Sequence, residues 1–132
     1  MTRIDHVGIA VESIQKAARL YTEGLGIALQ RTETVEDQGV KVGFLPLDSC
    51  EIELLEPVDD EGPVARFLAK QGEGIHHLCV QVDDIEAAMA RLREQGVRLL
   101  NKEPVRGAGG CLVAFVHPHS ANGVLLELSQ EL

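Results

Sequence analysis

The sequence repeats itself once, and this duplication constrains the fold more than any other feature. Residues 5–27 read DHVGIAVESIQKAARLYTEGLGI, and residues 76–97 read HHLCVQVDDIEAAMARLREQGV. In each copy a histidine stands in an apolar run, which is followed by acidic residues, a helical stretch and a glycine. The copies match at two histidines and, further along, at two glutamates: His6 with His77, and Glu53 with Glu127. Any fold of this chain must place these four side chains at equivalent positions.

The bulk properties limit the class of protein. At 132 residues the whole chain, 1–132, has the length of one compact domain. Each copy spans only about 60 residues, a size at which a separate core is marginal, so we expect the copies to share one core. The net charge of −9 disfavours nucleic acid and anionic membranes as partners. Three cysteines at no zinc-binding spacing indicate reduced thiols, and with no signal peptide or membrane span we expect a cytoplasmic protein.

Hydrophobic periodicity predicts the same order of elements in both copies: a strand, a helix and three strands. The first copy, about 3–57, is expected to hold strands at 4–11, 27–35, 40–47 and 51–57 and a helix at 14–23. After a connector helix at 63–70, the second copy, about 74–130, is expected to hold strands at 75–82, 97–101, 111–117 and 123–129 and a helix at 84–95. The predicted class is α+β, with two tandem β-α-β-β-β modules that form a cupped mixed sheet around a cleft and with helices on the outside.

Strand alternation places the matched histidines and glutamates on the smaller, more polar strand faces. His6 shares a face with Gly8 and Ala10, whereas the bulky Val7 and Ile9 lie on the other face, where a helix can cover them. The strands of the other three residues follow the same pattern. Two imidazoles and two carboxylates suit a borderline or hard divalent ion such as Co, Mn, Ni, Fe or Zn. We therefore predict that the cleft is a metal cleft, lined by His6, Glu53, His77 and Glu127.

Four stretches of the chain, IDHVGIAV, GIHHLCVQVDDIEAA, GAGGCLVAFVHP and GVLLEL, resemble the vicinal oxygen chelate superfamily, which includes glyoxalase I. More narrowly they are similar to the methylmalonyl-CoA epimerase family. This resemblance implies proton abstraction at C2 of an acyl-CoA substrate, a metal-stabilised enolate, cobalt as the favoured ion, and a homodimer. It also implies that Glu127 both ligates the metal and transfers a proton.

The resemblance leaves the second proton-transfer group open. Some bacterial members carry a glutamate three residues after the turn glycine, and in this chain that position is Val42. Glu51 shares a strand face with a predicted metal ligand and is one substitute. Glu36 and Asp37, near the turn, are two others, and a metal-bound water is a fourth.

A CoA tail requires cations at the mouth of the cleft, and Lys102 and Arg106 are the first choice, with Arg66 and Lys70 as weaker ones. The glycine-rich segment that contains Gly109 either cradles an anion through backbone N–H groups or forms a simple hairpin turn.

Three histidine and cysteine positions have ordinary structural interpretations. His76 faces away from its neighbour His77 and is read as structural or as a hydrogen-bonding partner. His117 either supports the site or stabilises a turn. Cys79 is expected to fill space beside His77, because no residue is placed to activate its thiol.

Three other functions fit the sequence less well. A glyoxalase I-like isomerase of a thiol adduct uses the same type of ligand set. A small-molecule-binding protein of the same fold predicts lost ligands, whereas all four are present here. A ring-cleaving dioxygenase requires two histidines and only one carboxylate.

Overall fold

The computed structural model describes residues 2–132, which form two compact units. The N-terminal unit is His6–His76, and the C-terminal unit is His77–Leu132 together with the residues up to Asp5. The strands β1 (Arg3–Ala10) and β5 (Gly74–Gln81) each contribute residues to both units. The single shared domain therefore stays a prediction, and each unit is described by itself.

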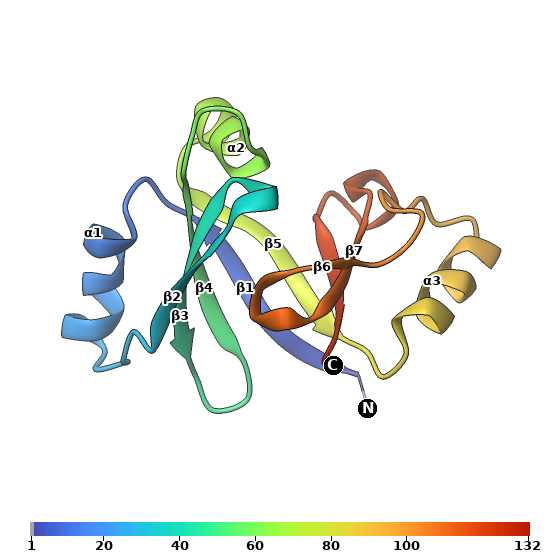
Figure 1. Ribbon diagram of the computed structural model, residues 1–132, viewed down its shortest axis with the longest axis horizontal. Coiled ribbons are helices and arrows are strands. Elements are labelled where there is room, and N and C mark those ends of the chain that lie inside the picture. The colour runs from blue at the N-terminus through green and yellow to red at the C-terminus, as the bar shows by residue number, and fades with distance from the viewer. Residues whose placement is uncertain (1) are drawn as a thin grey trace. The chain divides into compact units, whose positions relative to one another are not determined.

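The N-terminal unit follows the predicted order of strand, helix and three strands. After β1 come α1 (Ile14–Arg19), β2 (Arg31–Val35), β3 (Val40–Pro46) and β4 (Glu51–Pro57) (Figure 1). The strands are hydrogen-bonded in the order β2-β3-β4-β1, with β1 parallel to β4 and the other pairs antiparallel. The parallel pair arises because a helix connects β1 to the strands that follow, whereas short turns connect β2 to β3 and β3 to β4.

The core of the N-terminal unit lies between α1 and the apolar face of its sheet. Ile14 and Ala18 of α1 pack with Leu45 and Leu54, and all four are buried. Helix and sheet approach closely at Gly43, where an added Cβ would lie 2.9 Å from the Ile14 Cγ2 atom. This packing confirms that the bulky strand face is the one that the helix covers.

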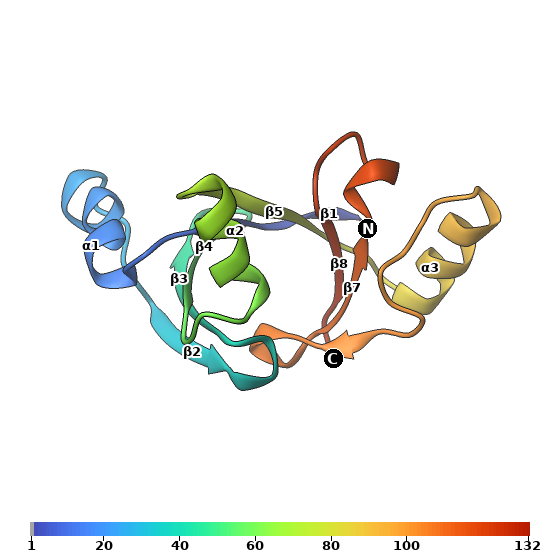
Figure 2. The same cartoon turned by 90° about the horizontal axis from the view of Figure 1, so that it is seen from above.

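The connector helix α2 (Pro63–Gln71) belongs to the N-terminal unit and lies alongside β4 (Figures 1 and 2). Pro63 begins the helix, where its missing N–H costs no hydrogen bond. Val64 is buried, and the Phe67 ring meets the edge of the His76 ring at a centroid distance of 5.1 Å. His76 is therefore part of the packing under α2, which agrees with its structural interpretation.

The C-terminal unit repeats the plan. After β5 come α3 (Ile85–Glu94), β6 (Val105–Arg106), β7 (Leu112–Val116) and β8 (Leu126–Gln130). The strand order is β5-β8-β7-β6, with β5 parallel to β8 and the other pairs antiparallel. Each unit is thus a mixed sheet with one helix on its apolar face, and the α+β class with two β-α-β-β-β modules is confirmed.

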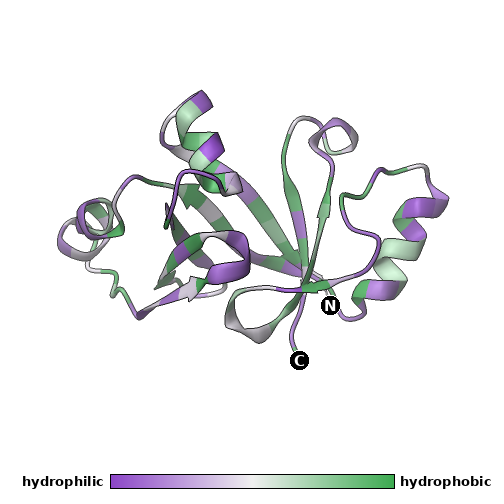
Figure 3. Ribbon diagram, turned by 45° about the horizontal axis from the view of Figure 1, so that its top comes forward, coloured by the Kyte–Doolittle hydropathy of each residue, from purple (hydrophilic) through white to green (hydrophobic). Residues whose placement is uncertain are grey.

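The core of the C-terminal unit lies between α3 and its sheet. The α3 helix carries both polar and apolar residues (Figure 3). Its buried side chains, Ile85 and Met89, pack against Ala114 of β7 and Leu128 of β8. The small residue under the helix is alanine here, at the position that Gly43 takes in the N-terminal unit.

The strand predicted at 97–101 is wrong: its only ladder contact is an isolated bridge between Leu99 and Val116, and the edge strand is β6 instead. The reason is local. The Asn101 side chain accepts a hydrogen bond from the Phe115 backbone N–H at 2.8 Å, so a side chain takes the acceptor place that a continuous ladder would give to a backbone carbonyl.

Two other predicted boundaries are also corrected. The α-helix predicted at 14–23 ends at Arg19 and continues as a π-type turn over Leu20–Gly24. The strand predicted from residue 27 begins at Arg31, because Ile27 and Leu29 turn into the core under α1. Within residues 2–132, no helix is long and apolar enough to cross a membrane.

Candidate metal centre

The N-terminal unit buries one histidine against one glutamate. His6 on β1 is 5% exposed and Glu53 on β4 is 6% exposed. Their side chains meet with His6 Nδ1 3.2 Å from Glu53 Oε2. The two strands run parallel, with Gly8 paired in register with Glu53. Gly8 has no side chain, which leaves the ligand face of β1 open next to the Glu53 carboxylate.

The C-terminal unit buries an equivalent pair. His77 on β5 and Glu127 on β8 are 6% and 7% exposed, and His77 Nε2 lies 2.9 Å from Glu127 Oε1. Cys79 is the register partner of Glu127, where the N-terminal unit has glycine. The duplication seen in the sequence therefore produces one histidine–glutamate contact in each unit.

A phenylalanine lies across the strand from each glutamate. Phe44 of β3 is the register partner of Glu53, and Phe115 of β7 is the register partner of Glu127. Directly opposed residues project from the same face of a sheet, so each ring lies on the ligand face. The Phe115 ring also meets the His77 ring edge-on at 6.4 Å. These aromatic neighbours limit the access of water to the carboxylates on one side.

Each ligand strand also holds the first turn of the helix of its unit. Glu56, three residues after Glu53, accepts a hydrogen bond from the Ile14 backbone N–H at 2.8 Å. Gln130, three residues after Glu127, accepts one from the Ile85 backbone N–H at 2.7 Å. Sequence reasoning missed this second matched pair, although its signal was present in the equal spacing from the matched glutamates. The contact ties the ligand strand to the helix and thereby fixes where the glutamate stands.

The donor chemistry of the two pairs fits a divalent cation. Burying a carboxylate is costly unless it is paired and hydrogen-bonded, and a neutral imidazole compensates none of its charge. The two units together carry two such carboxylates and two imidazoles. A cation of charge +2 balances that set, and nitrogen with oxygen donors is what borderline and hard divalent metals prefer.

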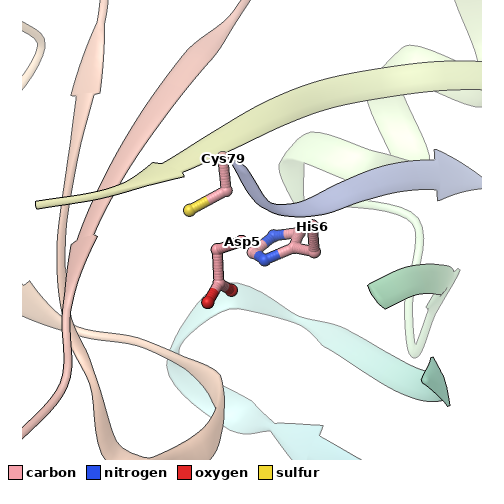
Figure 4. A group of neighbouring side chains, drawn as sticks. All are labelled: Asp5, His6 and Cys79. Carbon is pink, nitrogen blue, oxygen red and sulfur yellow. The ribbon is translucent and has the colours of Figure 1, made fainter. Parts of the chain in front are cut away.

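A second group of donor atoms includes a cysteine. Asp5 and Cys79, both in the C-terminal unit, have ligand atoms within 4.8 Å of each other, and Figure 4 shows them together with His6, the next residue along the chain. Cys79 is completely buried and Asp5 is half-buried. The thiol therefore has a carboxylate neighbour that strand alternation alone did not indicate.

The three residues predicted as alternative second bases fall in two places. Glu51 is on β4 and is the register partner of His6, so it shares the ligand face. Glu36 and Asp37 form the short helical turn between β2 and β3, outside the strand ladder, and both are exposed. Val42, the position of the missing glutamate, is 2% exposed and is the register partner of Leu55.

The residues predicted to contact CoA are all exposed or lie in turns. The Lys102 backbone carbonyl accepts a hydrogen bond from Arg93 Nη2 at 2.6 Å, and Arg106 lies at the end of β6. Gly109, at φ 74°, lies in the turn that joins β6 to β7, so this segment is a hairpin turn. The weaker choices, Arg66 and Lys70, are both on α2.

His117 stabilises a turn. Its Nδ1 atom accepts a hydrogen bond from the His119 backbone N–H at 2.9 Å, and this contact begins the short helical turn Pro118–Ser120. The turn-stabilising interpretation of His117 therefore agrees with its contact.

Comparisons with known proteins agree on one group of relatives. The model of the Glyoxalase/Bleomycin resistance protein/Dioxygenase superfamily matches residues 5–115. The ethylmalonyl-CoA/methylmalonyl-CoA epimerase of Cereibacter sphaeroides is 45% identical over 130 residues, which is 97% of this chain and 97% of that protein. The crystal structure of methylmalonyl-CoA epimerase from Mycobacterium tuberculosis is 40% identical with a TM-score of 0.93, covering 98% of this chain and 87% of that one. A variant of the Streptomyces coelicolor methylmalonyl-CoA epimerase, in complex with 2-nitronate-propionyl-CoA, is 37% identical with a TM-score of 0.95, covering 99% of this chain and 98% of that one.

Proposed function

The chain belongs to the Glyoxalase/Bleomycin resistance protein/Dioxygenase superfamily and, within it, to the methylmalonyl-CoA epimerase family. From that premise we propose that it is an isomerase that interconverts the R and S forms of methylmalonyl-CoA at C2. The observation that carries the proposal is the buried histidine–glutamate contact that occurs once in each unit. The named relatives support the substrate class, an acyl-CoA thioester with a carboxylate on the reacting carbon.

In this proposal His6, Glu53, His77 and Glu127 together hold one divalent ion. Cobalt is the ion we favour, and Mn, Ni, Fe and Zn are the alternatives with the same donor preference. When bound, such a cation stabilises the negative charge that develops on the thioester oxygen more than it stabilises the ground state. The phenylalanine beside each glutamate, buried at Phe44 and half-buried at Phe115, supports this role, because a site that excludes water strengthens electrostatic interactions.

Glu127 is the proposed base for one face of the substrate. Its carboxylate accepts the C2 proton, and the electron pair of the C–H bond moves toward the thioester carbonyl. His77 lies 2.9 Å from this carboxylate and holds it in place. Glu51, Glu36, Asp37 and a metal-bound water remain the groups proposed above for the opposite face.

Contacts outside the reacting carbon are also part of the proposal. Lys102 and Arg106 supply positive charge for the CoA phosphates, and the backbone near Gly109 lies in the adjoining turn. A homodimer is proposed by family resemblance, and Ile75, which is 66% exposed, is an apolar side chain that a partner would cover. A cytoplasmic location agrees with Cys50, Cys79 and Cys111, which are all thiols.

The proposal is tested by C2 proton exchange. The protein is stripped of metal with a chelator, reloaded with Co or Mn, and incubated with enantiopure methylmalonyl-CoA in deuterated water. We expect deuterium uptake and loss of stereochemical purity, both dependent on the added metal. A metal-loaded protein that catalyses no exchange overturns the proposal, and a glutathione hemithioacetal then becomes the next substrate to test. Ethylmalonyl-CoA in the same assay measures how large a C2 substituent the site accepts.

A further inference from the structure

The substrate of the proposed reaction carries negative charge in two places, on the carboxylate of the reacting carbon and on the phosphates of CoA. The N-terminal unit has one ligand face, which is the sheet face that carries His6 and Glu53. We propose that Arg31 on β2 binds an oxyanion of the substrate at this face, and this inference rests on the proposed epimerase function. Every residue in the argument belongs to the N-terminal unit.

The strand register places Arg31 on the ligand face. Gly8 of β1 and Phe44 of β3 are both register partners of Glu53 on β4. On its other side, Phe44 is the register partner of Arg31. Directly opposed residues project from the same face of a sheet, so Arg31 stands in the same cross-strand row as Glu53. Neighbouring strands are about 5 Å apart, which puts the Cα atoms of these two residues about 10 Å from each other.

Arg31 supplies the positive charge of this row. Within the paired strands of the N-terminal unit, all of which the structure describes, Arg31 is the one lysine or arginine on the ligand face. Lys41 of β3 projects from the opposite face, since it lies an odd number of residues from Phe44. The carboxylates of the ligand face are Glu33, Glu51 and Glu53. These carboxylates repel an anionic substrate, and a cation in their midst offsets that repulsion.

A phenylalanine ring supports the Arg31 guanidinium. The guanidinium carbon lies over the Phe44 ring, 3.9 Å from its centroid, and Phe44 is 3% exposed. This cation–π contact holds the group without using its N–H donors. The polar contacts of Arg31 within residues 2–132 are long: Nη1 donates to Gln30 Oε1 at 3.4 Å, and Nη2 is 3.7 Å from Glu33 Oε1. Bidentate contacts of a guanidinium with a carboxylate or phosphate are about 2.8 Å, so Arg31 retains the capacity for them.

The Arg31 guanidinium is also accessible to a ligand. Its side chain is 46% exposed, and that of Glu33 is 36% exposed. An ion pair between two such exposed side chains contributes little to stability. An oxyanion that accepts two short hydrogen bonds from Arg31 can therefore displace the Glu33 carboxylate.

The inference is tested by calorimetric binding to the metal-loaded protein with three probes. Racemic methylmalonyl-CoA carries both kinds of oxyanion, propionyl-CoA carries only the phosphates, and the N-acetylcysteamine thioester of methylmalonic acid carries only the carboxylate. Arg31→Met keeps an apolar side chain over Phe44 and removes the charge. We expect its affinity for methylmalonyl-CoA to fall about 10- to 100-fold. Arg31→Lys keeps the charge without the planar guanidinium and should lose less.

The two simpler probes identify the oxyanion. A loss of affinity in Arg31→Met that is confined to propionyl-CoA identifies a phosphate, and a loss with the short thioester identifies the carboxylate. Glu33→Gln should raise the affinity for the same probe about two- to fivefold, because the competing carboxylate is removed. A fall in its place contradicts the inference. Added salt should weaken binding of that probe to the wild type more steeply than to Arg31→Met.

Arg19→Met is the matched control, since Arg19 also pairs with a glutamate, Glu23, but lies on α1 with its side chain 72% exposed. It should bind all three probes like the wild type. Equal affinities of Arg31→Met and the wild type for all three probes overturn the inference, and so does an equal loss in Arg19→Met. C2 exchange separates this result from the proposed function. A wild type that catalyses no exchange overturns that function, whereas one that exchanges C2 while Arg31→Met binds every probe equally well overturns only the role of Arg31.

Discussion

The two units share one plan on their ligand faces but differ two residues further along the ligand strands. In the N-terminal unit the position after Glu53 on that face is Leu55, which is 4% exposed and is paired with Ala10 of β1. In the C-terminal unit the equivalent position after Glu127 is Ser129, which is 3% exposed and is paired with Gln81 of β5. The first is an apolar surface, and the second is polar.

This difference separates what the duplication preserved from what each unit changed. The histidine, the glutamate, the phenylalanine across the strand and the side chain that caps the helix occur twice. These are the parts that hold a ligand residue in place. The positions next to them have diverged, so each unit has its own surroundings for an otherwise matched histidine–glutamate contact.

The largest expected effect distinguishes the two ligand glutamates. Glu127→Gln should lower the rate of C2 exchange by about 1,000-fold, because the amide cannot accept the proton. Glu53→Gln should stay within about tenfold of the wild type, since an amide oxygen can still ligate the ion and this residue transfers no proton. Exchange rates and bound metal, measured by elemental analysis, check both variants. Equal losses in the two would mean that the units do not differ in this role.

The next largest expected effect is on stability and concerns the contact between helix and sheet in each unit. Gly43→Ala should destabilise the protein by about 2–3 kcal/mol, because the new methyl group lies too close to the β-branched Ile14. Ala114→Gly, at the equivalent position under α3, should cost about 1–2 kcal/mol through a lost buried methyl group and a freer backbone. Urea denaturation measures both. Gly24→Ala is the control, since its added Cβ would meet only Leu20 at 3.9 Å.

The helix contacts of the two ligand strands should also differ in strength. Glu56 offers an ionisable acceptor to the first turn of α1, whereas Gln130 offers a neutral one to α3. We expect Glu56→Ala to cost about 2 kcal/mol and Gln130→Ala about 1 kcal/mol, because charge-assisted hydrogen bonds are the stronger ones and a helix N-terminus favours negative charge. Thermal unfolding at low and high salt is the measurement. The Glu56→Ala difference should shrink with salt and the Gln130→Ala difference should not.

The smallest expected effect is a gain in the stability of the protein. Among residues 2–132, Gln81 Oε1 is buried with no hydrogen-bond partner. Gln81→Leu should therefore raise the free energy of unfolding by about 0.5–1 kcal/mol, since it replaces an unsatisfied polar atom with an apolar one. A loss of stability in urea denaturation would contradict this and would indicate that the amide is satisfied in solution.

Much of the fold followed from the sequence because the duplication repeats signals that are local. Strand alternation around His6 and Glu53 predicted their shared face, and the helix-covered face was predicted from Val7 and Ile9. Register was not predictable, since it depends on turn geometry and on pairing between distant strands. For that reason the phenylalanines that lie across the strand from Glu53 and Glu127 were not predicted. The strand predicted at 97–101 was wrong for a different reason. Asn101 accepts a hydrogen bond through its side chain, and hydrophobic periodicity carries no information about such a contact.

The residues up to Asp5 belong to the C-terminal unit, the rest of which begins at His77. On the ribosome residues 2–5 are made before the N-terminal unit, whereas the segments that complete their own unit are made after it. The N-terminal unit is continuous in the chain and can form as soon as it has been made, whereas the other unit must wait for the segments after residue 76 and then close a long loop. A nascent chain should accordingly gain protection from proteolysis in two stages. Deletion of residues 2–5 should lower the stability of the C-terminal unit, most of which lies after residue 76 in the sequence.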